Sequence, residues 1–374
     1  MTARHFPPFR LERWFAEFEF VSGMRNLAAS GPFAVTTREL LELESAETTA
    51  RYLNLGLDYI ENPGSESLRR AIANLYTTLK AEDVQVTLGA SEALLLLVWT
   101  MVKPGENIVV EDPCYENITG VAQALGLEVR RLPLRQEDDW KPDPEKLAQL
   151  IDRKTRLVYL IHPHNPTGSV LGREEMQTIA VMTERVGALL VNDEVFRLIA
   201  LEGEPMPSIV DVVEQAVSIG DMSKPWGLGG LRVGWIASRQ HELLQRISEA
   251  RDYASMCCSA PGAFLAELAL RHSAPVLTPR LATARANRDG LAQAIAYSQG
   301  TLSWQPPHAG YTCFVQLPIH LSSTKFCRHL AQEKRVLLVP GQVYGAAYEH
   351  FMRIGFGCTT QVFEEGLDVV MGEI

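Results

Sequence analysis

A lysine on a glycine-rich turn is the residue around which the chemistry of this chain is organised. The stretch from Ser218 to Trp235 reads Ser-Ile-Gly-Asp-Met-Ser-Lys-Pro-Trp-Gly-Leu-Gly-Gly-Leu-Arg-Val-Gly-Trp. Pro225 disfavours a helical conformation at Lys224, and the glycines let the backbone approach a bound group closely. Lys224 could form an imine with an aldehyde cofactor, and Arg232 could bind its phosphate. Taken alone, the stretch could equally be a surface loop with a solvated lysine.

An aldehyde cofactor with a pyridine ring also needs a carboxylate, ring-oxygen donors and a phosphate site. Asp193 ends an apolar strand-like run, and a buried acid there could pair with a pyridinium nitrogen. Asn165, in a His-Pro-His-Asn-Pro-Thr-Gly turn, could donate to the ring oxygen. Tyr115 could stack on the ring. Each residue has an ordinary explanation as a cap or turn residue, so only their combination favours a cofactor site.

The phosphate would lie where a strand-like run turns into a helix. Gly89, Ala90 and Ser91 form this turn, and the start of a helix offers free N–H groups and the positive end of its dipole to an anion. Ser223 and Arg232 could contribute a hydroxyl and a guanidinium to the same phosphate.

Alternating strand-like and helical segments predict the scaffold. The predicted strands at 108–111, 157–161, 189–192, 217–220 and 233–237 are continuously apolar, as in a parallel sheet covered on both faces. A further strand is predicted at 84–88, and short strands are predicted at 312–317 and 336–339. Predicted helices lie at 65–80, 92–102, 118–125, 144–151, 173–186, 242–253, 261–272, 281–297, 323–333 and 361–371. We predict an α/β fold, with an N-terminal helix and extended arm (1–50) joining a small α+β domain (280–374), and a large, mostly parallel domain (51–279). The candidate residues then share one sheet edge, where ligands bind in such folds.

Composition narrows the class of function. The chain has 374 residues, a formal net charge of −10 and no basic stripe, so we expect no nucleic-acid partner. The first twenty residues lack the apolar core of a signal peptide, and no apolar run is long enough to span a membrane. We therefore expect a cytoplasmic protein with reduced thiols and no metal site, because no metal-ligand spacing occurs among Cys114, Cys257, Cys258, Cys313, Cys327 and Cys358.

The motifs Asn-Pro-Thr-Gly, Asn-Asp-Glu-Val and Ser-Lys-x-x-Gly-Leu-x-Gly-x-Arg-x-Gly-Trp resemble the fold type I, class I/II aminotransferase superfamily of pyridoxal 5'-phosphate (PLP) enzymes. The resemblance implies a PLP cofactor, with Lys224 as Schiff base and proton shuttle. It also implies that Asp193 binds the ring nitrogen and Arg353 the substrate α-carboxylate, with Asn165 beside the ring oxygen. It further implies a homodimer with a shared site, in which Tyr59 reaches the partner's phosphate.

Two positions depart from the usual family pattern. Phe196 stands where most of these transaminases have a tyrosine that donates to the ring oxygen, and Asp221 stands where a Ser or Thr usually meets the phosphate. Phe196 cannot donate a hydrogen bond. A carboxylate beside a phosphate is unfavourable unless it turns away or meets a cation. Both departures cast doubt on ordinary transamination, although Phe196 would still lie beside the cofactor.

A subset of the family, the cyclases of hydroxylated arginine that form capreomycidine or enduracididine, is more similar. The resemblance rests on Pro-His-Asn-Pro, Arg-Asp-Tyr, Thr-Pro-Arg-Leu, Val-Pro-Gly and Arg-Ile-Gly-Phe segments. It implies Cα deprotonation, loss of water and closure of a guanidine ring, with 4-hydroxyarginine preferred over 3-hydroxyarginine as the expected substrate. The acids that could hold the guanidinium are Glu17, Glu19, Asp58, Glu61 and Glu116, each of which could equally be a solvated surface group.

Three other functions remain open at this point. An amino-acid aminotransferase would use every cofactor residue named above. An oxidase or lyase could use the same scaffold. A regulator that senses the cofactor ranks lowest, because about fifty residues precede the domain and include no basic recognition helix.

Overall fold

The computed structural model describes residues 5–374, and within them a seven-stranded sheet forms the centre of the larger domain. The strand order is β2 (Val84–Thr87), β8 (Gly234–Ala237), β7 (Val217–Asp221), β6 (Leu189–Asp193), β5 (Thr155–Ile161), β3 (Asn107–Asp112) and β4 (Glu128–Pro133). The strands from β7 to β4 run parallel, whereas β8 is antiparallel to both of its neighbours. The predicted mostly parallel sheet is confirmed.

Helices cover both faces of this sheet. Successive residues of a strand point to opposite faces, so each strand contributes apolar side chains to two separate clusters. Ile108 and Leu157 belong to one buried apolar cluster, and their neighbours Val109 and Val158 belong to another. The first cluster includes residues of α5 (Ala90–Met101), α6 (Asn117–Ala124) and α9 (His241–Arg251). The second includes residues of α4 (Glu66–Ala73), α7 (Pro144–Leu150), α8 (Arg173–Val186) and α10 (Ala260–Arg271).

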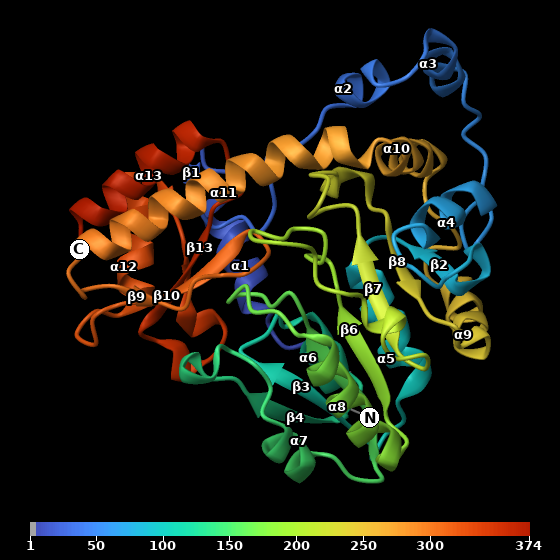
Figure 1. Cartoon of the computed structure of the whole chain (residues 1–374), viewed down its shortest axis with the longest axis horizontal. Coiled ribbons are helices and arrows are strands. Elements are labelled where there is room, and N and C mark those ends of the chain that lie inside the picture. The colour runs from blue at the N-terminus through green and yellow to red at the C-terminus, as the bar shows by residue number, and fades with distance from the viewer. Residues whose placement is uncertain (1–4) are drawn as a thin grey trace.

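A smaller antiparallel sheet forms the second domain. Its strand order is β12 (Val339–Pro340), β13 (Phe351–Gly355), β10 (Thr312–Gln316) and β9 (Ser303–Trp304), and β1 (Arg25–Asn26) pairs separately with β11 (Val336–Leu337). The helices of this domain are α1 (Arg10–Phe18), α11 (Ser273–Tyr297), α12 (Ser323–His329) and α13 (Thr360–Gly372). Leu11, Trp14 and Phe18 anchor α1 in its core, and in Figure 1 α1 lies where the two sheets approach each other.

Several elements differ from the sequence-based expectation. The strands β4 and β13 were not predicted, since β4 alternates exposed charged residues with apolar ones and β13 is short with an arginine at its centre. The helix α11 begins at Ser273 instead of Leu281, and it continues through Pro279. This helix extends from α10 to the small sheet (Figure 1) and spans the proposed domain boundary at 279/280.

The stretch after residue 36, expected to be extended, contains two short helices, α2 (Thr37–Glu42) and α3 (Ala46–Leu53). Thr36 caps α2 by accepting a hydrogen bond from the Glu39 N–H at 3.1 Å, and the Glu39 carboxylate accepts from the Thr36 N–H at 2.6 Å. This Thr-x-x-Glu capping box was readable in the sequence. Leu40 of α2 packs into the core of the large sheet.

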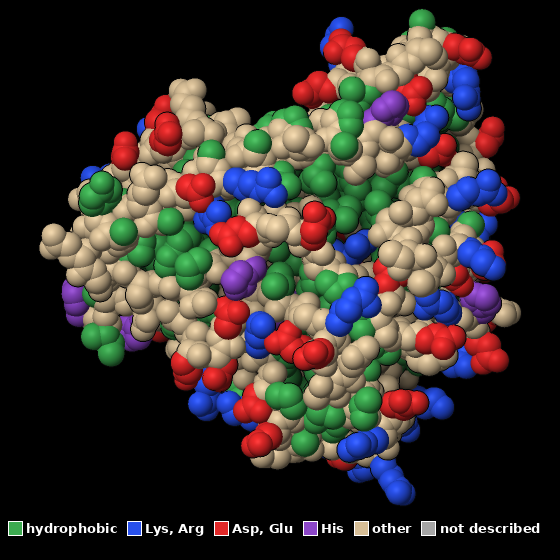
Figure 2. Space-filling model, in the orientation of Figure 1, with side chains coloured by type: hydrophobic (Ala, Val, Ile, Leu, Met, Phe, Trp, Pro, Cys, Tyr) green, Lys and Arg blue, Asp and Glu red, His purple; other side chains and the backbone are tan. Residues whose placement is uncertain are grey.

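No helix in residues 5–374 is both long enough and apolar enough to cross a membrane. On the face drawn in Figure 2, acidic and basic side chains are interspersed, with groups of hydrophobic side chains between them.

Candidate active site

A cavity of about 1120 Å³ lies beyond the carboxyl ends of the parallel strands. Tyr115, Asn165, Asp193 and Lys224, which follow or end four different strands, line it together. The opposite wall comes from α1 and residues 29–34. The structure therefore brings together the residues that the sequence placed at one sheet edge, as expected for an α/β sheet.

Lys224 lies on the turn that follows β7. Its Nζ donates to Ser30 Oγ at 3.0 Å. Burial lowers the pKa of Lys224, and the nearby Asp221 carboxylate partly opposes this effect. A lowered pKa increases the fraction of neutral amine at a given pH, which is what a nucleophilic or proton-accepting lysine requires.

Asp193 ends β6 and is buried. Its Oδ2 accepts a hydrogen bond from Tyr159 OH at 2.9 Å, and its Oδ1 accepts from the Val195 N–H at 3.2 Å. Burial nevertheless raises the pKa of Asp193 to about 6. A buried carboxylate with two neutral donors and no ion pair in residues 5–374 fits a cationic partner such as a protonated pyridine nitrogen.

Asn165 and Arg353 are joined at the boundary between the two domains. Asn165 Oδ1 accepts from Arg353 Nη1 at 3.2 Å, which leaves the amide nitrogen of Asn165 as the group that can donate to a ligand. Arg353, on β13, also donates to Tyr344 OH at 2.8 Å and to the Ala28 carbonyl at 2.7 Å. The Nε of this fully buried arginine has no hydrogen-bond partner among the described residues. An anion such as a carboxylate would satisfy it.

The start of α5 and Arg232 form the end of the cavity that suits an anion. Gly89 adopts φ +78°, and a Cβ atom there would lie only 2.5 Å from Arg232 Nη2. Glycine is therefore required at this position. Ala90 and Ser91 line the cavity beside it. N–H groups at a helix start, together with a guanidinium, suit a phosphate.

Asp221 also faces this end of the cavity. Its Oδ2 accepts from the Ala90 N–H at 3.0 Å, and its Oδ1 accepts from the Ser223 N–H. Asp221 has not turned away, because its carboxylate is bound to two amides at the anion end. A phosphate held there would meet a negative charge beside it as well as the positive charge of Arg232.

Two aromatic residues complete the cofactor side. Tyr115 lines the cavity, its ring centre lies 5.0 Å from that of Phe9, and its OH donates to Glu12 Oε1 at 3.1 Å. Phe196 is buried and also lines the cavity. It offers an apolar surface in place of a hydrogen-bond donor.

Tyr59 does not line the cavity within this chain. It is 82% exposed, on the segment that follows α3. Its contact with the phosphate of a second subunit remains a prediction.

The two histidines near Asn165 are held by the surrounding structure. His162 Nε2 lies 2.7 Å from Glu111 Oε1. His164 Nε2 lies 3.0 Å from the Pro113 carbonyl oxygen, its Nδ1 lies 2.8 Å from Thr167 Oγ1, and burial lowers its pKa to about 4. Both ring nitrogens of each histidine have protein partners and neither histidine lines the cavity, so both residues position the loop.

Among the acids considered as guanidinium partners, only Glu19 lines the cavity. Glu17 forms an ion pair with Arg328, and Glu116 pairs with Arg10. The remaining two candidates, Asp58 and Glu61, are exposed and lie outside it.

Glu12 is a cavity residue that sequence reasoning missed. A signal for it existed, because buried residues at 11, 14 and 18 leave positions 12, 15 and 19 together on the adjacent face of α1. Ser30, the partner of Lys224, follows a stretch with no periodic pattern and gave no such signal.

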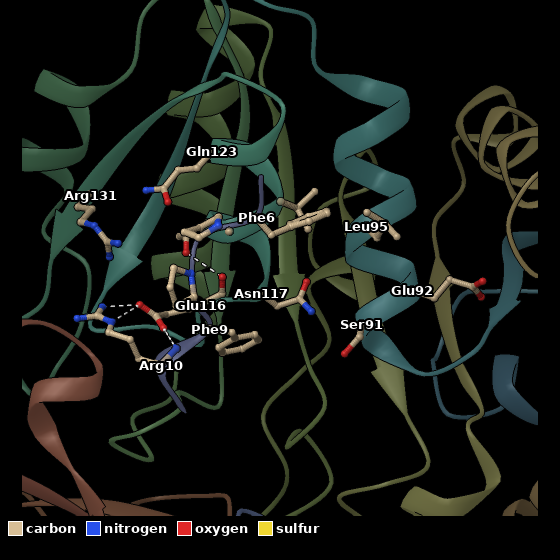
Figure 3. Close-up of a pocket in the computed structure, with 15 residues that line it drawn as sticks. Phe6, Phe9, Arg10, Ser91, Glu92, Leu95, Glu116, Asn117, Gln123 and Arg131 are labelled. Atoms are coloured by element: carbon tan, nitrogen blue, oxygen red, sulfur yellow. Dashed lines mark hydrogen bonds and ion pairs between the residues drawn. The ribbon is translucent and has the colours of Figure 1, made fainter. Parts of the chain in front are cut away.

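A second cavity of about 710 Å³ adjoins the first and shares Phe9, Ser91 and Asn117 with it. Figure 3 shows the Arg10–Glu116 ion pair on the wall of this second cavity. Glu116 is therefore neutralised outside the main cavity.

The chain belongs to the aminotransferase class I and II family, whose model matches residues 32–370. PLP is the cofactor, and the site's own residues fit it. Lys224 can meet its aldehyde, Asp193 its ring nitrogen, and the start of α5 with Arg232 its phosphate.

Within this family the chain is similar to proteins of two kinds. It is 33% identical to capreomycidine synthase from Streptomyces vinaceus over 98% of this chain and 94% of that protein. The solved structure of the PLP-dependent cyclase OrfR matches with a TM-score of 0.89 and 31% identity, over 100% of this chain and 98% of that one. A PLP-dependent aminotransferase from Streptococcus suis matches with a TM-score of 0.92 and 29% identity, over 98% of this chain and 97% of that one.

Proposed function

We propose that this enzyme is a PLP-dependent cyclase that converts a hydroxylated L-arginine into a cyclic guanidino amino acid. The observation that carries the proposal is the nearly full-length similarity to capreomycidine synthase. The similarity to the cyclase OrfR and the absence of a hydrogen-bond donor at Phe196 support it. The preferred substrate in this proposal is 4-hydroxyarginine, followed by 3-hydroxyarginine.

The residues have distinct roles in this proposal. PLP, when bound, accepts the electron pair left on Cα after a proton is removed. Lys224 Nζ removes that proton, and its lowered pKa favours this role. The Asp193 carboxylate keeps the ring nitrogen protonated, and Asn165 donates to the ring oxygen. Arg353 holds the α-carboxylate of the substrate through paired N–H donors.

The proposed reaction needs no second substrate. Cα loses a proton, the side-chain hydroxyl leaves as water, and a guanidine nitrogen bonds to the carbon that carried it. That nitrogen loses a proton, and Lys224 returns one to Cα. A hydroxyl on C3 gives a six-membered ring, as in capreomycidine. A hydroxyl on C4 gives the five-membered ring of enduracididine. This route requires Lys224 to remove a further proton from Cβ, and a proton returns to Cβ after the guanidine nitrogen has added to C4.

The alternative is an amino-acid aminotransferase. The match to the Streptococcus suis aminotransferase favours it, because the fold and most cofactor residues would serve both reactions.

We further propose a homodimer in which Tyr59 reaches the cofactor phosphate of the other subunit. Leu53, Leu57 and Tyr59 are all exposed on one short segment, which is consistent with burial against a second copy. Sedimentation velocity would test the oligomeric state.

The decisive experiment follows product mass after PLP-loaded protein is mixed separately with 3-hydroxyarginine and 4-hydroxyarginine, without any 2-oxo acid. We expect one substrate to lose a single water. The loss should be abolished in Lys224→Ala and retained in Lys325→Ala, a matched change at an exposed lysine on α12. Turnover that appears only after a 2-oxo acid is added would establish the aminotransferase instead.

A further inference from the structure

We propose that Glu12 and Glu19 bind the guanidinium group of the substrate and thereby select arginine-type amino acids. This inference rests on the proposed function in one respect only, namely that the cavity takes an amino acid. It places the site for the side chain of the substrate on α1, a helix that carries none of the proposed cofactor-binding residues.

The two carboxylates face the cavity because of how α1 packs. Leu11, Trp14 and Phe18 are buried in the small-domain core. Glu12 and Glu19 lie on the adjacent face and both line the cavity. Seven residues correspond to about two turns and about 10 Å along the axis, a separation that two glutamate side chains can span around one planar cation.

Neither carboxylate is neutralised by the protein that the structure describes. Within residues 5–374, Glu12 and Glu19 form no ion pair, whereas Glu17 on the same helix pairs with Arg328. Glu12 accepts one hydrogen bond from Tyr115 OH, at 3.1 Å, and Glu19 accepts one from Asn26, at 3.4 Å. Each carboxylate therefore keeps most of its acceptor capacity for a ligand.

Their mutual repulsion adds to the need for a cation. Burial raises the pKa of Glu19, and the nearby charge of Glu12 raises it further, while the Asn26 hydrogen bond and the charge of Lys224 oppose this rise only in part. A cation placed between them would relieve both effects. A guanidinium is suited to this place because its planar fork binds carboxylates with paired hydrogen bonds and is weakly hydrated.

An independent feature next to the cavity suits an anion. Arg353 is fully buried, and its Nε has no hydrogen-bond partner among the described residues. Its guanidinium lies 5.8 Å from the ring centre of Phe15, which lines the cavity on the same face of α1. Two unpaired acids thus line the cavity for a cation. The unsatisfied donor of Arg353 lies behind its wall, next to the lining residues Asn165 and Phe15, where it suits a carboxylate. Together these groups match both ends of arginine.

The first test compares L-arginine with L-citrulline, in which a neutral urea replaces the guanidinium, by calorimetric binding to the PLP-loaded wild-type protein. We expect arginine to bind about a hundredfold more tightly, because it alone makes charge-assisted hydrogen bonds to the two acids. Equal affinities for the two ligands would overturn the proposal without the need for any variant.

The second test uses Glu12→Gln and Glu19→Gln, with Glu17→Gln as the matched control on the outer face of the same helix. We expect each of the first two changes to reduce the arginine preference at least tenfold and to leave citrulline affinity nearly unchanged. Glu17→Gln should keep the wild-type preference. A preference that survives the change at both sites would contradict the proposal.

These outcomes separate the inference from the proposed function. If arginine is preferred through Glu12 and Glu19 but no hydroxyarginine loses water, the guanidinium site stands and the cyclase proposal fails. If water is lost but the arginine preference does not depend on these acids, the cyclase stands and the guanidinium site is wrong.

Discussion

The cofactor side and the substrate side of the cavity are built in different ways. Asp193 and Lys224 come from the ends of adjacent parallel strands in the large domain, where backbone pairing and helices on both faces fix their positions. Glu12 and Glu19 come from α1, near the start of the chain, and line the cavity. Arg353 comes from β13, near the end of the chain, and lies behind the cavity wall, hydrogen-bonded to Asn165. The packing of the small domain positions all three. The residues proposed to carry out the chemistry thus lie at the strand ends of the large sheet. The residues proposed to select the substrate lie in the small domain, which packs against it.

This difference has a consequence for function. A change on α1 can alter which amino acid is bound without moving the strand ends that carry the proposed catalytic groups. A change at a strand end should affect all substrates alike. The following predictions test that separation.

The largest effect is expected for Asp193→Asn. We propose that this buried charge keeps the ring nitrogen protonated, so its removal should lower kcat by about a thousandfold, the scale seen when one electrostatic partner is removed from a buried site. Steady-state kinetics with any accepted substrate would measure it, with absorbance confirming that the cofactor is bound. Tyr159→Phe, which removes one donor to Asp193 and keeps the charge, should give a much smaller loss. A loss below tenfold for Asp193→Asn would contradict the proposal that the catalytic groups lie at the strand ends of the large sheet.

Arg353→Lys should act on substrate binding. Lysine keeps the charge but loses the paired donors, so we expect KM to rise about a hundredfold with a smaller change in kcat. Argininamide, which lacks the α-carboxylate, provides the control, because it should bind wild type and variant with similar affinity. Equal weakening for arginine and argininamide would show that Arg353 supports the fold and does not hold the carboxylate.

The raised pKa of Asp193 should be visible in the stability of the cofactor-free protein. Burial raises this pKa from 3.8 to about 6, so the protonated form stabilises the fold below the lower value, and that stability is lost as pH rises through the higher one. Relative to Asp193→Asn, the wild type should lose about 1.4 kcal/mol of unfolding free energy between pH 5 and pH 8. Urea unfolding at both pH values measures the difference. Parallel pH profiles for the two proteins would contradict it.

The sequence predicted the residues on the cofactor side of the cavity better than those on the substrate side, and the reasons are physical. The residues after β5, β6 and β7 occur in short motifs beside continuously apolar strands, so their convergence at one edge follows from the rule for parallel sheets. Their assigned roles remain predictions. The acids on α1 carry no such motif. Glu17 and Glu19 were equal candidates in the sequence, and only the packing of Trp14 and Phe18 shows which one faces the cavity.

Other differences also have physical causes. The strand β13, which carries Arg353, is short, and its stability comes from antiparallel pairing with β10 and β12, which a local sequence pattern does not reveal. Tyr59 is exposed in the single chain, so its proposed contact with a cofactor phosphate would require a second copy.

The smallest expected effect concerns Asp221, a carboxylate at the anion end of the cavity. Its carboxylate accepts from the Ala90 and Ser223 N–H groups at the anion end of the cavity, so a bound phosphate would meet a like charge there. We expect Asp221→Asn to lower the dissociation constant of PLP about fivefold, equivalent to about 1 kcal/mol. Fluorescence titration of the cofactor-free protein measures it, and Asp138→Asn, at an exposed acid, is the control. Weaker binding in Asp221→Asn would instead mean that this carboxylate stabilises the phosphate site by holding its two amides in place.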